Sequence, residues 1–73
     1  MTHLLLELVD NDGIKIEVTG RDIADLQNEL ARTITDNGYG ASDVGAQFNV
    51  EKIEKPWRNF IGVMSYNGRF VPA

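Results

Sequence analysis

The sequence predicts an α+β fold in which a single helix packs on one face of a mostly antiparallel sheet of four or five strands. Three observations lead to this prediction. Residues 19–38 form the only run with strong helical periodicity, the segments on both sides alternate apolar and polar residues, and turn-forming pairs separate those segments. The expected order is strand, strand, helix, strand, strand, strand. A chain of 73 residues has room for one core, so we expect a single domain over residues 1–73.

The helix is expected over residues 20–37. Thr19 is the expected N-cap, because Asp22 three residues later completes a near capping box, and Gly38 is expected to end the helix in a left-handed conformation. Apolar residues at spacings of three and four form one stripe, made of Ile23, Leu26, Leu30 and Ile34. The other side is polar and rich in acid, and carries Asp22, Asp25, Asn28, Glu29, Arg32 and Asp36. One helix cannot bury its own stripe, so the strands must supply the surface on which it packs.

The residues before the helix predict a β-hairpin. Residues 3–9 alternate as a strand does, with a short helix as the competing interpretation because leucine is only a moderate strand former. Residues 10–13, Asp-Asn-Asp-Gly, are typical of a tight turn, and residues 14–18 alternate cleanly. The side chains expected on the core side of this hairpin are Leu4, Leu6, Leu8, Ile14, Ile16 and Val18.

The residues after the helix predict a loop at 38–43 and then a third strand. That strand alternates through Ala46, Phe48 and Val50. Its phase is lost near Lys52, where we expect a bulge or the end of the strand.

A final hairpin is predicted from the turn signals of the last twenty residues. Pro56 indicates a turn at 54–57, since proline lacks an amide donor and disfavours helix at the residue before it. Residues 60–66 form an expected strand that is apolar on both faces, and Asn67-Gly68 predicts a two-residue turn into a short strand at 69–71. Such a turn places Tyr66 opposite Arg69, and Met64 opposite Val71.

The stretch IKIEVTGRDIADLQNEL, residues 14–30, resembles the start of ubiquitin-like domains in its pattern of strand, cap and amphipathic helix. The resemblance covers about the first half of the chain and makes a β-grasp arrangement a candidate for the fold. The chain ends Val71-Pro72-Ala73 instead of in the paired glycines that ubiquitin-like modifiers and sulfur carriers use. We therefore expect neither conjugation nor sulfur transfer.

Composition narrows the classes of function. The chain has no cysteine, which excludes a disulfide framework, a thiol nucleophile and any cysteine-ligated metal. The net charge of −4 disfavours nonspecific binding to phosphate backbones. No segment matches a signal peptide, and the longest apolar run near the start is three leucines, so we expect a cytoplasmic protein without membrane association.

No motif predicts catalysis, and we expect a non-enzyme without cofactor or metal. His3 is the only histidine and is expected to be exposed at the start of a strand, without a partner. Residues 10–13 do not fit a calcium loop, because Leu8 would occupy its first ligand position. The glycines of residues 38–45 follow a helix instead of preceding one, unlike a nucleotide loop. Residues 42–43, Ser-Asp, lack a nucleophile elbow.

The C-terminal third combines aromatic residues with arginine. The aromatic residues are Trp57, Phe60, Tyr66 and Phe70, and Arg58 and Arg69 lie among them. These residue types are enriched at protein-binding hot spots and also stack on single-stranded bases. Two interpretations stay open at this point: the segment closes the core, or its uncovered side meets a partner or a second copy of the chain.

We therefore predict a non-catalytic, acidic protein-binding module, of the inhibitor or accessory-regulator kind that phages and plasmids encode. A basic, nucleic-acid-handling protein is the expected partner for the acidic helix. The alternative is a nucleic-acid-binding module that uses the aromatic and arginine residues of the last hairpin, and a homodimer also stays open. The predicted contact residues are Trp57, Arg58, Phe60, Tyr66 and Arg69 of the hairpin, with Asp22, Asp25 and Glu29 of the helix.

Overall fold

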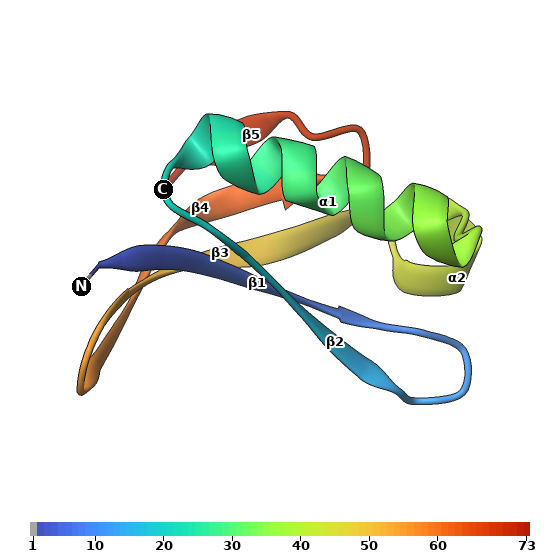
Figure 1. The fold of residues 1–73 in the computed structure, drawn as a ribbon, viewed down its shortest axis with the longest axis horizontal. Helices are drawn as coiled ribbons and strands as arrows, with labels where there is room; N and C mark the ends of the chain where they lie inside the picture. Colours follow the sequence, from blue (N-terminus) through green and yellow to red (C-terminus); the bar gives the residue numbers. More distant parts are fainter. Residues whose placement is uncertain (1) are drawn as a thin grey trace.

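Five strands form one antiparallel sheet in the order β2-β1-β3-β4-β5, and the main helix lies across one face of it (Figure 1). This computed structural model describes residues 2–73. The strands are β1 (His3–Val9), β2 (Lys15–Gly20), β3 (Gln47–Glu54), β4 (Trp57–Ser65) and β5 (Phe70–Pro72). The helices are α1 (Ile23–Asn37) and the single turn α2 (Ala41–Val44). The predicted α+β class and the order of the main elements are confirmed.

Two parts of the chain form the sheet, β1 and β2 before α1, and β3, β4 and β5 after it, and α1 connects them. β2 and β3 both pair with β1 in the antiparallel sense, so they run parallel to each other with β1 between them. Parallel strands need a long crossover connection, which α1 provides. The segment that resembles ubiquitin-like domains folds as strand and helix of this unit, and β3, β4 and β5 then follow as an antiparallel meander.

The first hairpin forms as predicted, with one exception. Leu8 lies opposite Ile16, and Leu6 lies opposite Val18, so the alternating leucines share one face. Ile14 does not join them: its side chain is 57% exposed. The reason is local, because Ile14 belongs to the turn, where its amide donates to Asp10 Oδ1 at 2.9 Å and its carbonyl accepts from the Asp10 amide at 3.1 Å.

The helix begins three residues later than expected, at Ile23 instead of residue 20. Thr19 is part of β2, and Asp22 is the N-cap, with its Oδ1 accepting from the Asp25 amide at 2.8 Å. Asp25 also accepts a hydrogen bond from the residue before the cap: its Oδ2 accepts from the Arg21 amide at 2.9 Å. That hydrogen bond, together with the Arg21 charge, holds the pKa of Asp25 below its ordinary value. The end is as predicted, with Gly38 left-handed at φ 66°.

This cap gives a first testable outcome. Asp22→Ala removes the acceptor for the Asp25 amide and is expected to lower the free energy of unfolding by about 1 kcal/mol. Thr19→Ala is the matched control, expected to change it by less than about 0.5 kcal/mol because Thr19 is exposed and caps nothing. Urea unfolding followed by circular dichroism measures both. A larger loss in Thr19→Ala than in Asp22→Ala would contradict the observed cap.

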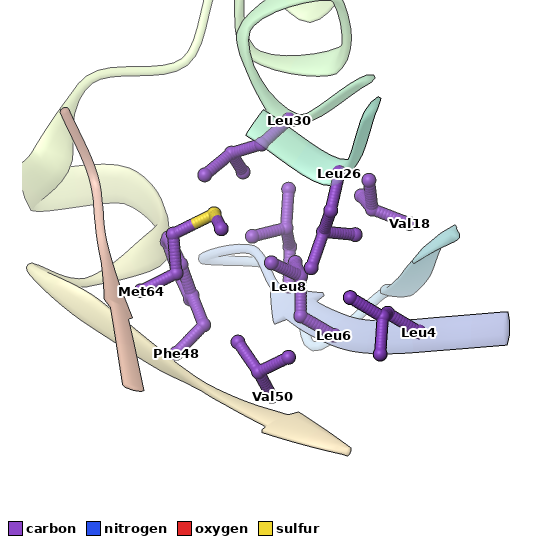
Figure 2. Close-up of a cluster of buried hydrophobic side chains, with 9 residues drawn as sticks. All are labelled: Leu4, Leu6, Leu8, Val18, Leu26, Leu30, Phe48, Val50 and Met64. Carbon is purple, nitrogen blue, oxygen red and sulfur yellow. The ribbon is translucent and has the colours of Figure 1, made fainter. Parts of the chain in front are cut away.

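The core lies between α1 and the sheet (Figure 2). Leu26 and Leu30 point from the helix toward the leucines of β1, and Phe48 and Met64 close the cluster from β3 and β4. The buried members are Leu4, Leu6, Leu8, Val18, Leu26, Leu30, Phe48, Val50 and Met64. The other two residues of the predicted stripe, Ile23 and Ile34, are half-buried and pack at the margin of this cluster. The stripe is therefore confirmed as the inner side of the helix.

The third and fourth strands are longer than expected. β3 continues without interruption through Lys52, and the irregularity lies in its partner instead. Val50 faces Gly62 while Glu51 faces Phe60, which leaves Ile61 as an extra residue in β4. The predicted loop after the helix also contains the one-turn helix α2.

The last hairpin has a different register from the predicted one. Ser65 faces Arg69, since the Ser65 amide donates to the Arg69 carbonyl at 2.9 Å, and Gly68 is left-handed at φ 89°. This three-residue loop replaces the expected two-residue turn. Met64 therefore lies opposite Phe70 on the helix side, and the expected pairs Tyr66–Arg69 and Met64–Val71 are wrong.

The loop is longer because Tyr66 is held elsewhere. Its amide donates to the Ala46 carbonyl at 2.8 Å, and its hydroxyl donates to the Tyr39 carbonyl at 2.7 Å. The helix fixes the other side of the loop, where Gln27 Nε2 donates to the Gly68 carbonyl at 2.7 Å. Contacts with distant segments thus override the local preference of Asn67-Gly68.

Candidate protein-binding face

The sheet has one face that α1 does not cover, which we call the open face. Strand residues alternate between the two faces, and the register extends this alternation across all five strands. The residues of the open face are His3, Leu5, Glu7 and Val9 of β1, Lys15, Glu17 and Thr19 of β2, Gln47, Asn49, Glu51 and Ile53 of β3, Arg58, Phe60, Val63 and Ser65 of β4, and Val71 of β5.

Three apolar residues of the open face are exposed. Phe60 is 53% exposed, Val71 54% and Val9 49%. Leu5 and Ile53 are buried, although they lie outside the core cluster on the helix side. The open face therefore combines a shielded apolar centre with exposed apolar residues around it, as surfaces that meet other proteins do.

A groove runs where β1 and β3 separate. Their pairing ends at Leu5 and Glu51, and beyond that point Glu7 and Val9 diverge from Gln47 and Asn49. The groove has a volume of about 440 Å³, and its lining consists of Glu7, Val9, Val44, Gln47, Phe48, Asn49, Glu51 and Phe60. Val44 of α2 and the edge of Phe48 give it apolar walls. The polar residues of its lining are Glu7, Gln47, Asn49 and Glu51.

An ion bridge crosses the open face beside this groove. Arg58 Nη2 lies 2.7 Å from Glu51 Oε1 and 3.4 Å from Glu7 Oε1. Because β3 lies between β4 and β1, the Arg58 side chain must cross β3 to reach Glu7, and its aliphatic part is placed to shield Ile53, its neighbour across the hairpin. The hydrogen bond to Glu51 raises the pKa of Arg58. Lys15 Nζ adds a contact to Glu7 at 3.5 Å.

Three of the predicted hairpin residues gather at one end of β4. Trp57 is 68% exposed and is the first residue of β4, directly after the turn, with Arg58 and Phe60 following on the open face. In Figure 1 the β3–β4 hairpin extends beyond the part of the sheet that α1 covers. The structure thus brings the exposed aromatic residues of the chain to one projecting end.

The other two predicted hairpin residues lie apart from this group. Tyr66 is half-buried and is held by its hydrogen bonds to Tyr39 and Ala46. Arg69 lies beyond Ser65 at the opposite end of β4, roughly 23 Å along the strand from Arg58 at about 3.3 Å per residue. The expected single surface of Trp57, Arg58, Phe60, Tyr66 and Arg69 is therefore not formed.

The acidic side chains predicted as contacts on the helix already have interaction partners within the chain. Asp22 and Asp25 form the N-terminal cap, and Asp25 also lies 3.5 Å from Arg21. Glu29 Oε1 lies 3.5 Å from Arg32 Nη1. These residues lie on α1 or at its N-cap, across the sheet from the open face, so helix and hairpin do not make one combined surface.

Polar residues near the first turn form a structural network. Asp10 Oδ1 accepts from the amides of Asp12 and Ile14, and Tyr39 donates its hydroxyl to Asp10 Oδ2 at 3.1 Å. The Ile14 hydrogen bond lowers the pKa of Asp10, while burial raises the pKa of Tyr39. Asn11 links the same turn to Asp43 of α2 at 3.1 Å. The segment is a turn, as predicted, and it fixes the loop that follows the helix.

His3 also differs from its expected setting, since it is half-buried in β1 opposite Ile53. Within residues 2–73, no group of three or more histidine, aspartate or glutamate side chains is arranged to hold a metal ion.

Sequence reasoning missed several residues of the open face, notably Glu7, Val9 and Glu51. A signal for two of them existed: if Leu4, Leu6 and Leu8 face the helix, then Glu7 and Val9 face the other way. The two-residue turn at 55–56 would also have paired Ile53 with Arg58. The Ile61 bulge, which moves Gly62 opposite Val50 and Val63 opposite Asn49, had no signal in the sequence.

Comparison with known proteins identifies no relative. A scan against protein-family models finds no match, and searches of the curated proteins and of the solved structures find none either. Neither helix in the described part of the chain has the length and apolar character needed to cross a membrane.

Proposed function

We propose that this chain is a non-catalytic protein-binding module whose contact surface is the open face around the β3–β4 hairpin. The observation that supports it is the exposure of Phe60 beside a groove on the face that α1 does not cover, with Trp57 exposed at the adjoining end of β4. Aromatic side chains anchored at such places are the residues that supply most of the free energy of binding at protein interfaces. Occupation of a larger protein's surface is the corresponding mode of action, as an inhibitor or accessory regulator.

The charges of the open face fit this role. Arg58 pairs with Glu51 and Glu7, so a partner can cover Phe60 without leaving the neighbouring charges unmatched. The same ion bridge holds the Arg58 side chain in place, which reduces the entropy lost on binding. The net charge of −4 favours a basic partner through long-range attraction, and a nucleic-acid-handling protein has that character.

The alternative, a nucleic-acid-binding module, has less support. Arg58 is held by two carboxylates and Arg69 lies at the far end of β4, so the arginines do not form a basic stripe. A fluorescence titration with single-stranded oligonucleotides at low salt tests it. Salt-sensitive binding that Arg58→Ala weakens would favour this alternative.

Phe60→Ser tests the proposed surface. With the tagged chain immobilised in native lysate, we expect Phe60→Ser to weaken retention of the captured partner roughly thirtyfold, as the loss of a hot spot of about 2 kcal/mol does. Trp57→Ser is expected to act in the same direction. Both variants should keep the unfolding midpoint nearly unchanged, because the two side chains are exposed.

Val71→Ser is the matched control, since Val71 is as exposed as Phe60 and lies on the same face but away from the groove. It is expected to retain the partner fully. Equal retention by the wild type, Phe60→Ser and Trp57→Ser would exclude this surface as the contact.

A further inference from the structure

The two edges of the sheet differ in how well they are protected. β5 is only three residues long and ends at Pro72, which has no amide to donate. β2 has six residues, without proline or bulge, and it forms the other edge. Short strands and proline prevent edge pairing, so β5 is blocked while β2 is able to accept another strand.

The backbone phase of β2 shows which groups are free at its edge. The Ile14 carbonyl accepts from the Asp10 amide, so Ile14 directs its carbonyl inward, toward the strand β1. This direction alternates in an antiparallel ladder, and Ile16 and Val18 therefore also bond to β1. The residues whose amides and carbonyls point to the free edge are Lys15, Glu17 and Thr19. All three are exposed.

One of these residues has an unbalanced charge. Glu17 lies directly opposite Glu7 on the open face, and like charges in this position destabilise a strand pair. The ion pairs of residues 2–73 occupy Glu7 with Lys15 and Arg58 and include no cation for Glu17. Lys15 belongs to the same strand, two residues before Glu17, and points to the same face.

We propose that β2 pairs with β2 of a second copy, antiparallel, around a two-fold axis at Ile16. In this register Lys15 lies opposite Glu17 of the second copy, and Glu17 lies opposite its Lys15. Both are edge-directed residues, so each such pair exchanges two backbone hydrogen bonds and adds an ion pair on the open face. The two sheets then form one continuous antiparallel sheet with a closed, isologous contact.

Charge selects this register over its neighbours. A two-fold axis at Glu17 would place two copies of Glu17 opposite each other, and an axis at Lys15 would do the same with lysine. An axis at Val18 pairs Glu17 with Thr19 and leaves Glu17 without a cation. Among these registers, only the axis at Ile16 places each charge opposite a charge of the other sign. The same charge pattern disfavours pairing with strands of other sequence.

The apolar side chains of β2 fit the same register. On the helix side, Ile16 meets Ile16 of the second copy, and Ile14 meets its Val18. Ile14 is 57% exposed in the single chain, and the contact removes it from water. The dimer uses the β2 edge and leaves Trp57 and Phe60 free, so it does not depend on the proposed partner surface.

Charge reversal at the edge tests the dimer. The full chain has a mass of 8.1 kDa, and sedimentation velocity over a range of concentrations is expected to show a shift to twice that mass. Glu17→Lys places Lys15 opposite lysine in both pairs and is expected to weaken dimerisation roughly tenfold or more. The double variant Lys15→Glu/Glu17→Lys reverses both charges and is expected to restore the dimer.

The charge of Glu7 distinguishes the effect of Glu17→Lys on folding from its effect on dimerisation. Glu17→Lys replaces a repulsion with an attraction across β1 and β2, so this variant should unfold at the same or higher denaturant concentration while losing the dimer. Glu54→Lys, with the same change of net charge at the β3–β4 turn, should dimerise like the wild type. A wild type that stays monomeric up to millimolar concentration would overturn the proposal. So would a dimer unaffected by Glu17→Lys, or a double variant that fails to recover.

Discussion

Leu26→Ala is expected to lower the free energy of unfolding by about 3 to 5 kcal/mol, the range for a leucine removed from a close-packed core. Leu26 is completely buried at the centre of the helix stripe, between α1 and the leucines of β1. A chain of 73 residues has a total stability of roughly 4 to 11 kcal/mol, so this single change removes a large share of it. Urea unfolding at fixed protein concentration measures the loss.

Val9→Ala provides the comparison, because Val9 is a 49% exposed apolar residue of the sheet. It is expected to lower the free energy of unfolding by less than about 1 kcal/mol. If the two variants lose equal stability, the core does not lie between α1 and the sheet as described.

Gly20→Ala is expected to lower the free energy of unfolding by about 3 kcal/mol, the upper end of the range for overpacked sites. A Cβ at Gly20 would lie 2.5 Å from the Leu26 amide nitrogen and 2.7 Å from its Cα. Both atoms are backbone atoms of α1, so no side chain can rotate away and the helix itself must move off β2. Thermal unfolding and the urea midpoint measure this effect.

Gly13→Ala is the comparison that distinguishes a steric clash of the added Cβ from backbone strain alone. Gly13 is left-handed at φ 79° but has no atom within 4 Å of an added Cβ. Its replacement is expected to lower the free energy of unfolding by about 1 to 2 kcal/mol, from the conformation alone. A Gly20→Ala variant as stable as the wild type would show that α1 does not approach β2 so closely.

The elements of the first half could be predicted from the sequence because their signals are local. The alternation of residues 3–9 and the stripe around Leu26 and Leu30 depend on strand and helix periods, which any chain segment carries by itself. The exact cap was not predictable in this way, since Thr19 and Asp22 both offer a side-chain acceptor. Pairing of β2 with β1 up to Gly20 decides between them, because it keeps Thr19 in the strand.

The second half was less predictable because distant contacts set its registers. Asn67-Gly68 favours a two-residue turn, yet the contacts of Tyr66 with Ala46 and Tyr39 stabilise a longer loop. The extra residue at Ile61 likewise depends on the pairing of β3 with β4. Each shift of one residue moves a side chain to the other face, so errors in register become errors in the predicted surface.

For the candidate site, the sequence by itself determined the residue types: aromatics, arginine and acids, with a single histidine and no cysteine. It also determined that one helix cannot cover both faces of a sheet, so an open face had to exist. Only the tertiary structure decided that Trp57 and Phe60 gather at the β3–β4 hairpin while Tyr66 supports a loop.

The tertiary structure also decided the charges of that surface. Arg58 meets Glu7 and Glu51 only because the sheet order brings β1, β3 and β4 together, an arrangement that spans 51 residues of sequence. The physical reason is that periodicity acts between neighbours in the chain, whereas strand order and register depend on the packing of the whole core.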